Sequence, residues 1–222
     1  MSHSTASVFV LPRHCDLLKL SQIQINTPCI VLQVSFHTTI TMAVPVLPYT
    51  VHYYNSLPEL QAAKDQFESR QASDILFTKI GETIVKHGVE KMLGIVLLHN
   101  HFLLERHEML VNFELVAVPV ATGSGTKELG AVSACAWRCV ENSIAPYEFT
   151  HAGEEIRLES EQMQSFLAEF GAILAEKNLS NILGICSLRE KPFDRPTTTE
   201  FTSGRANITC QMHSGLNRLI DK

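Results

Sequence analysis

An excess of basic residues is missing from this 222-residue sequence, whose formal net charge is −5. Neutralising the phosphates of a nucleic acid requires a basic surface, and no run of Lys and Arg supplies one. Long apolar runs are missing too, because no stretch reaches the ~18 residues that a membrane span requires. We therefore expect a protein that binds neither nucleic acid nor a membrane.

Closely spaced cysteine pairs are also absent. The six cysteines include no Cys-x-x-Cys motif, which argues against a thioredoxin-like site and against a zinc ribbon. The closest two, Cys135 and Cys139, are more typical of small buried hydrophobic residues than of metal ligands. A secretory signal peptide needs an uninterrupted apolar core, which Pro12 and Asp16 break near the start of the chain. We therefore expect reduced cysteines and a cytoplasmic location.

The first 41 residues differ in composition from the remainder. They contain a single acid, Asp16, and two bases, Arg13 and Lys19, among many Ser, Thr and Gln residues. A mitochondrial presequence would be richer in arginine. We interpret residues 1–41 as a poorly ordered N-terminal extension, in which the apolar run 29–36 is a candidate strand. Residues 42–222 are predicted to form a single α+β domain.

Two segments of the chain align without a gap, "IGETIVKHGVEKMLGIVLL" at 80–98 and "FGAILAEKNLSNILGICSL" at 170–188. Gly88 aligns with Asn178, and these two residue types most readily adopt the left-handed conformation that ends a helix. A short apolar run suited to a buried strand follows each of them. The alignment predicts two helix-turn-strand halves, arising either from duplication or from the general likeness of such units. The identical positions are Gly81/Gly171, Leu93/Leu183, Gly94/Gly184, Ile95/Ile185 and Leu98/Leu188.

Periodicity and capping residues predict the remaining elements. Ser160 is a plausible N-cap for a helix with one apolar stripe, and Ser73 is a similar cap for a helix over 74–87. The Gly-Ser-Gly stretch at 123–125 is interpreted as a hairpin loop. The fold class that follows is α+β, with a mostly antiparallel sheet and helices packed on one face. A further helix is expected at 57–69, the stripe comprises Met163, Phe166, Leu167, Phe170 and Leu174, and strands are expected at 94–99, 110–121, 131–140, 154–158, 182–188 and 200–210.

Polar residues cluster directly after the first of these strands, in "GIVLLHNHFLLERHEMLV" at 94–111. His99 and His101 would share one face if the strand continued through them, because alternate residues of a strand point to the same side. His107 and Glu108 follow within a few residues and could fold back towards them. Imidazoles and carboxylates are ligands for divalent first-row metals. We predict His99, His101, Glu108 and His107 as candidate metal ligands.

Two other interpretations of this cluster remain open. Without a metal, His99 and His101 are candidates for catalytic proton transfer, since histidine titrates near neutral pH, and Glu108 would orient them or act as partner base. Alternatively, the histidines are structural residues at the mouth of a strand, hydrogen-bonded to their neighbours.

The segment "LHNHFLLERHEMLV" resembles a group of uncharacterised fungal proteins whose sequence runs approximately His-Arg-His-Phe-x-Leu-x-x-x-Glu-x-x-Val. The segment departs from that pattern at Asn100, which replaces a basic residue, and at Leu103, which replaces an acidic one. "PYEF" at 146–149 is similar as well. The group has no established activity, so the resemblance implies a eukaryotic, intracellular origin and supplies no mechanism. The match falls on His99, His101, Phe102, Leu104, Glu108 and Val111.

Together these features predict a protein that binds or converts a small molecule at a polar His/Glu site, with or without a divalent metal ion. One alternative is a non-catalytic interaction or scaffold domain with incidental histidines. Another, which only the resemblance suggests, is an auxiliary enzyme of fungal small-molecule biosynthesis. The sequence leaves the oligomeric state open.

Overall fold

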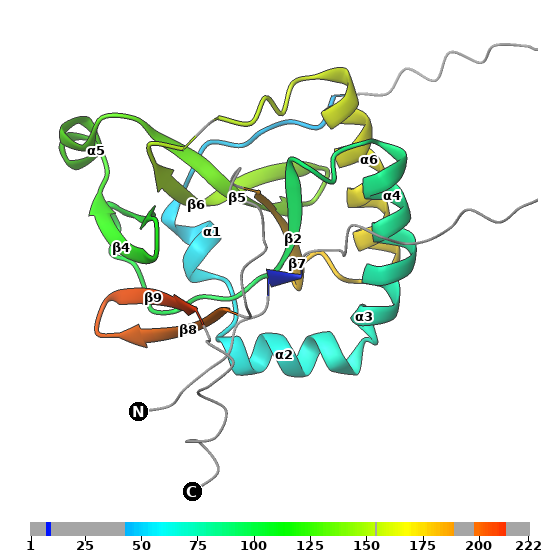
Figure 1. Cartoon of the computed structure of the whole chain (residues 1–222), viewed down its shortest axis with the longest axis horizontal. Coiled ribbons are helices and arrows are strands. Elements are labelled where there is room, and N and C mark those ends of the chain that lie inside the picture. The colour runs from blue at the N-terminus through cyan, green and yellow to red at the C-terminus, as the bar shows by residue number, and fades with distance from the viewer. Residues whose placement is uncertain (1–7, 10–42, 154, 189–197, 212–222) are drawn as a thin grey trace, which may run out of the picture.

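The structure, a computed structural model of the chain, describes residues 8–9, 43–153, 155–188 and 198–211. These residues form helices and one nine-stranded sheet, which confirms the predicted α+β class (Figure 1). All strand pairings in the sheet are antiparallel except that of β3 with β6. The strands lie in the order β1 (Val8–Phe9), β2 (Leu93–Leu97), β7 (Leu183–Ser187), β5 (Val132–Val140), β6 (Ser143–His151), β3 (Glu108–Phe113), β4 (Val116–Ala121), β9 (Ala206–Gln211) and β8 (Thr198–Ser203).

The helices α4 and α6 stand side by side against β2 and β7 (Figure 1). As predicted, the Ser160 side chain caps α6 by accepting a hydrogen bond from the Met163 N–H at 3.3 Å, and the whole apolar stripe of this helix is buried. The cap predicted at Ser73 is wrong, because the helical segment already begins at Ala72, after Gln71 in a left-handed conformation. The helices are α1 (Val51–Asn55), α2 (Leu60–Ser69), α3 (Ala72–Ile75), the π-helical turn η1 (Leu76–Ile80), α4 (Gly81–Lys86), α5 (Ser124–Leu129) and α6 (Glu161–Glu176).

The sheet has a core on each face. Along β2, Ile95 packs in the larger core with α4 and α6, whereas Val96 packs on the opposite side. This alternation follows from the two-residue period of a strand. The second core is covered by α1, whose Tyr54 is fully buried beside Leu98 and Tyr147. Helix α1 was not predicted, and it reaches the face of the sheet that α4 and α6 leave open.

Several predicted strand boundaries are wrong. The strand expected over 110–121 is the hairpin β3–β4, which turns through Glu114 at φ 56°. The strand expected over 200–210 is the hairpin β8–β9, which turns through Gly204. Residues 155–158 do not form the predicted strand, and β6 was not predicted. The stretch at 123–125, expected to be a hairpin loop, leads into α5. In each hairpin, residues that favour strands, such as Val, Ile, Thr and Phe, lie on both sides of the turn, so composition alone did not reveal the reversal.

The two helix-turn-strand units have the same backbone geometry. Gly88 and Asn178 both adopt the left-handed conformation, at φ 64° and 56°, as predicted. The residue after each turn residue donates its N–H back to the helix, from Val89 to Ile84 O and from Leu179 to Leu174 O. That the units arose by duplication stays a prediction.

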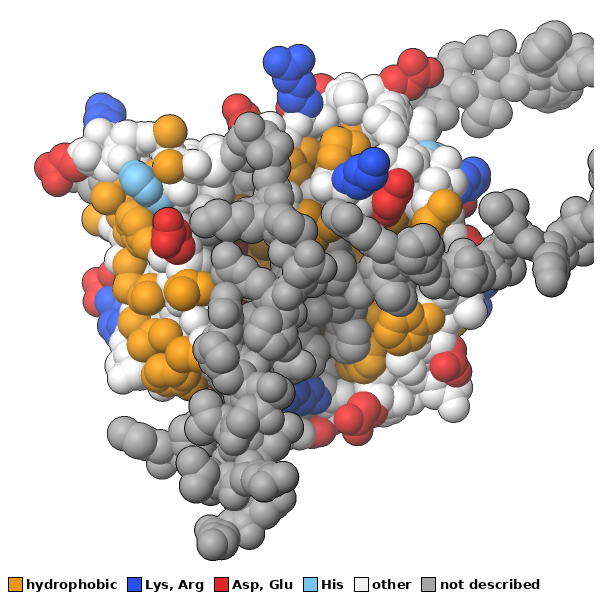
Figure 2. Space-filling view, viewed as in Figure 1, with side chains coloured by type: hydrophobic (Ala, Val, Ile, Leu, Met, Phe, Trp, Pro, Cys, Tyr) orange, Lys and Arg blue, Asp and Glu red, His pale blue; other side chains and the backbone are white. Residues whose placement is uncertain are grey.

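The segment predicted as an N-terminal extension contributes β1, which pairs with the free edge of β2. Its other residues, including the candidate strand at 29–36, lie outside the described part of the chain. Among the described helices, none has the length and apolar character to cross a membrane. On the face drawn in Figure 2, basic side chains are dispersed among acidic and hydrophobic ones.

Candidate metal centre beyond the end of β2

His99 and His101 lie in the connection that follows β2. The prediction that they lie on the strand itself is wrong, because β2 is Leu93–Leu97. β2 ends at Leu97, and the chain is then held by the Leu98 N–H, which donates to Ile182 O at 2.8 Å. Asn100 donates its backbone N–H to Pro58 O at 2.9 Å. This path brings the rings of His99 and His101 together, with centroids 4.7 Å apart and planes at 83°.

Helix α1 forms hydrogen bonds with the same connection. The Tyr54 hydroxyl accepts a hydrogen bond from the His101 N–H at 3.1 Å. The Asn55 side chain donates to Leu104 O and accepts from Leu104 N–H, at 2.8 and 2.9 Å. Arg138 of β5 in turn donates to Tyr53 O at 3.0 Å, at the C-terminal end of α1. A chain of contacts therefore runs from the sheet through α1 to the histidines.

His99 has one ring nitrogen engaged and one without a partner. Its side chain is buried, with the residue 7% exposed, and Nδ1 lies 2.8 Å from Leu97 O. A carbonyl can only accept, so Nδ1 carries the proton and Nε2 carries a lone pair. Burial lowers the pKa of His99, so the neutral ring is favoured. Among the described residues, Nε2 finds no hydrogen-bond donor.

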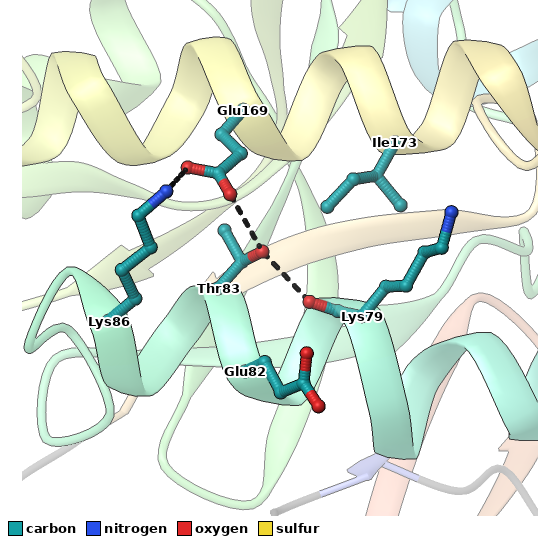
Figure 3. A pocket seen from close by; sticks show the side chains of 6 residues that line it. All are labelled: Lys79, Glu82, Thr83, Lys86, Glu169 and Ile173. Atoms are coloured by element: carbon teal, nitrogen blue, oxygen red, sulfur yellow. Dashed lines mark hydrogen bonds and ion pairs between the residues drawn. The ribbon is translucent and has the colours of Figure 1, made fainter.

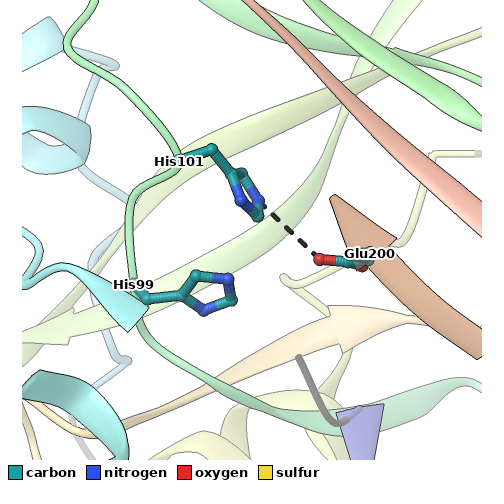
Figure 4. A group of neighbouring side chains, drawn as sticks. All are labelled: His99, His101 and Glu200. Atoms are coloured by element: carbon teal, nitrogen blue, oxygen red, sulfur yellow. Dashed lines mark ion pairs between the residues drawn. The ribbon is translucent and has the colours of Figure 1, made fainter. Parts of the chain in front are cut away.

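The third member of the cluster is Glu200, from the hairpin β8–β9 (Figure 4). Glu200 lies opposite Thr209 and Thr202 opposite Asn207, so Glu200 and Asn207 occupy one face of the hairpin. The Asn207 Nδ2 lies 3.1 Å from His101 Nε2 and 3.3 Å from Glu200 Oε2. His101 Nε2 and Glu200 Oε2 are 3.9 Å apart. Asn207 Oδ1 is buried and has no partner among the described residues.

The charges of this cluster suit a cation. One ligating atom each from His99, His101 and Glu200 lies within 4.8 Å of the others. Burial, with a smaller effect of His99, lowers the pKa of His101 to about 3, so both rings present neutral nitrogens at neutral pH. Burial also raises the pKa of Glu200, because no positive charge in the described structure compensates its carboxylate.

Two of the predicted ligands lie elsewhere. The Glu108 carboxylate pairs with the Arg205 guanidinium and accepts the Glu105 N–H at 2.7 Å. The hydrogen bond from Arg205 lowers the pKa of Glu108. His107 is exposed, and its carbonyl accepts the Thr122 N–H. Of the four predicted ligands, the described cluster thus contains His99 and His101, and Glu200 takes the place predicted for Glu108.

A surface groove lies between α4 and α6, away from the histidine cluster (Figure 3). Both of its lysines form ion pairs, Lys86 with Glu169 at 2.7 Å and Lys79 with the neighbouring Glu176 at 3.3 Å. The Thr83 hydroxyl donates to Lys79 O at 2.8 Å within the helical segment. These ion pairs connect α6 to α4 and to the preceding turn η1, so they are typical of contacts that hold packed helices together.

No protein-family model, curated protein or solved structure matches the chain. We therefore infer function from the geometry of the residues themselves.

Proposed function

We propose that the protein binds a divalent transition-metal ion through His99, His101 and Glu200, and that this centre binds or converts a small molecule. The observation that carries the proposal is the unpaired Nε2 of buried His99, in a cluster with His101 and Glu200 that offers one ligand atom from each residue within 4.8 Å of the others. A buried polar atom without a partner costs ~1–3 kcal/mol, which a bound cation would remove. The Leu97 carbonyl on Nδ1 supports the proposal, since ligating histidines are commonly oriented by such a contact.

The spacing of the donors is close to that of a metal site. Nitrogen and oxygen ligands lie roughly 2.0–2.2 Å from zinc, so neighbouring ligand atoms are roughly 3.0–3.5 Å apart. His101 Nε2 and Glu200 Oε2, at 3.9 Å, need only a small rotation of their side chains to reach that range. Turning the Asn207 amide by half a rotation would offer its unpaired Oδ1 to the same space.

The donor set favours an open centre over a closed structural one. Two imidazoles and one carboxylate are the ligands of many catalytic zinc sites and of non-haem Fe(II) sites, which keep positions free for water or substrate. Structural zinc sites instead use four protein ligands, usually with cysteine. The expected ion is Zn²⁺ or Fe²⁺, with a small molecule taking the free positions.

Metal analysis of protein purified without a histidine tag tests the proposal. After removal of bound metal, the protein is titrated with Zn²⁺ and with Fe²⁺ under anaerobic conditions, and bound metal is measured by elemental analysis. We expect about one ion per chain. His99→Ala and Glu200→Gln should each weaken binding at least ~10-fold, because each removes one of three ligands.

Two exposed residues from the same connection provide matched controls. His107→Ala removes an imidazole and Glu105→Gln removes a carboxylate, and neither residue belongs to the cluster. Both variants should bind metal like the original protein. Equal binding by His99→Ala and His107→Ala would contradict the proposal and favour the non-catalytic interaction domain.

A further inference from the structure

The side-chain amide of Asn207 lies between two of the proposed ligands. Its backbone is fixed on β9, where Asn207 lies opposite Ala117 of β4 on one side and Thr202 of β8 on the other. The amide Nδ2 lies 3.1 Å from His101 Nε2 and 3.3 Å from Glu200 Oε2. The amide Oδ1 is buried and has no partner among the described residues. Rotation of this amide would therefore exchange its nitrogen and oxygen while the backbone stays in place.

The neighbours of the amide determine how it is oriented in the metal-free protein. The carboxylate of Glu200 can only accept hydrogen bonds, so the amide nitrogen faces it. The same nitrogen then donates to His101 Nε2, which accepts through its lone pair. Asn207 thus engages a lone pair on each of two proposed ligand atoms. A cation has to displace the amide nitrogen before it binds to His101 and Glu200.

We propose that Asn207 is the fourth ligand of the metal centre and that its amide turns by half a rotation when the cation binds, so that Oδ1 faces the ion. The inference rests on the proposed function. After the turn, Oδ1 takes the place of Nδ2, 3.1 Å from His101 Nε2 and 3.3 Å from Glu200 Oε2. Neighbouring ligand atoms on zinc are roughly 3.0–3.5 Å apart, so both distances fit a shared ion. No described contact holds Oδ1 in its present place, so the turn breaks no hydrogen bond there.

A fourth protein ligand leaves room for a small molecule. Catalytic zinc can expand to about five ligands, and an octahedral Fe²⁺ ion takes about six. The amide oxygen carries no net charge, so a divalent ion bound to two neutral imidazoles and one carboxylate keeps an excess positive charge. The amide therefore completes the protein's side of the centre and leaves the remaining positions to the small molecule.

Two substitutions at Asn207 test the inference through the Zn²⁺ affinity of the metal-free full-length protein, measured by competition with a chelator. Asn207→Leu nearly keeps the shape of the side chain and removes both polar atoms. Asn207→Asp keeps an oxygen ligand, adds a negative charge and removes the competing N–H groups. We expect Asn207→Leu to bind at least ~10-fold more weakly than the original and Asn207→Asp at least ~10-fold more tightly. Exposed Asn142, in the turn between β5 and β6, supplies matched controls, and Asn142→Leu and Asn142→Asp should bind like the original.

The direction of the change separates a ligand from a residue that only blocks the site. If Asn207 donated to His101 and Glu200 without ever binding the ion, Asn207→Leu would free both ligands and bind Zn²⁺ more tightly. Equal or tighter binding by Asn207→Leu, or binding by Asn207→Asp no tighter than that of the original, would therefore overturn the inference. Absence of Zn²⁺ binding in the original protein would overturn the proposed function and the inference with it, so the two failures are distinguishable.

A crystal structure of the unmutated protein loaded with Zn²⁺ covers the case in which the variants at Asn207 fail to fold. We expect the Asn207 side-chain oxygen at roughly 2.0–2.2 Å from the ion, together with one atom each from His99, His101 and Glu200. A bound ion with the Asn207 amide more than ~3 Å away would also overturn the inference.

Discussion

Ile95 of β2 lies directly opposite Ile185 of β7, and the antiparallel register is symmetric about this pair. Around it, Gly94 faces the space filled by Leu188, and Gly184 faces the space filled by Leu98. These residues are the same ones that align between the two helix-turn-strand segments. The identities therefore have a common physical reason: each glycine leaves room for the leucine that follows the other strand.

The two glycines should differ in their tolerance of a methyl group. A Cβ at Gly184 would lie 2.5 Å from the Trp137 carbonyl oxygen, which is backbone and cannot yield cheaply. A Cβ at Gly94 would lie 2.9 Å from the end of the Leu188 side chain, which can rotate. We expect Gly184→Ala to lower the free energy of unfolding by about 2–3 kcal/mol and Gly94→Ala by less, as measured by denaturant titration.

Gly171 of α6 provides the control for these substitutions, because a Cβ there would meet nothing within 4 Å. Gly171→Ala should raise stability by ~0.5–1 kcal/mol through helix propensity. Equal effects at Gly94 and Gly184 would show that the clash with the carbonyl is relieved by backbone movement.

Glu148→Gln should change how the stability of the metal-free protein depends on pH. Burial, followed by the negative charge of Glu200, raises the pKa of this carboxyl on β6 to about 7 in the folded state, against 4.5 ordinarily. Between these values the folded state holds a proton that the unfolded state has lost. Glu148 therefore lowers stability as pH rises through this window. Glu148→Gln should be about 2–3 kcal/mol more stable than the original at pH 8 and equal to it near pH 4, as measured by urea unfolding. The same difference at both pH values would contradict a raised pKa at Glu148.

Arg138→Gln should loosen α1 and, through it, the proposed metal centre. The guanidinium donates to Tyr53 O, to Ser56 Oγ at 2.9 Å and to Asn181 Oδ1 at 3.0 Å, which a glutamine cannot span together. We expect a loss of about 2–3 kcal/mol in unfolding free energy and roughly tenfold weaker Zn²⁺ binding. The exposed Arg106→Gln is the control and should change neither quantity. If Arg138→Gln lowers stability but leaves the Zn²⁺ affinity unchanged, α1 does not position the histidines.

Glu108→Gln should have little effect on metal binding. Its partner Arg205 has a side chain that is 43% exposed, and pairs of this kind contribute less than ~1 kcal/mol. We expect Zn²⁺ affinity within a factor of ~2 of the original, measured beside Glu200→Gln under the same conditions. A loss as large as that of Glu200→Gln would restore Glu108 to the ligand set.

The helix-turn-strand units were predictable because local signals specify them. The Ser160 cap, the apolar stripe of α6 and the left-handed positions Gly88 and Asn178 all act within a few residues of the chain. The hairpin at Glu114 was not predictable in this way, because glutamate carries no turn preference and takes φ 56° only in the folded context. Helix α1 was missed because five residues are too few to establish a helical period.

The candidate site was half predictable for a related reason. His99 and His101 follow an apolar strand, so their proximity to each other could be inferred from the sequence. The identity of the carboxylate beside them depends on which hairpin packs there. No local pattern links Glu200 to a histidine about a hundred residues earlier. Glu108 was nearer to the histidines in sequence. In the structure, however, its carboxylate pairs with Arg205, which lies in the turn between β8 and β9.

His101 and Asn207 touch although they are 106 positions apart in the chain. β8 and β9 are the last two strands of the sheet order, so this contact fastens its outermost hairpin to the connection after β2. An ion bound at the proposed centre would stabilise the state in which this hairpin is packed in place. The gain in free energy is RT ln(1 + [ion]/Kd), about 2.7 kcal/mol when the ion concentration is a hundred times Kd. Proteases that cleave opened edges would then remove the metal-free protein first, so the lifetime of the chain would follow the supply of its metal.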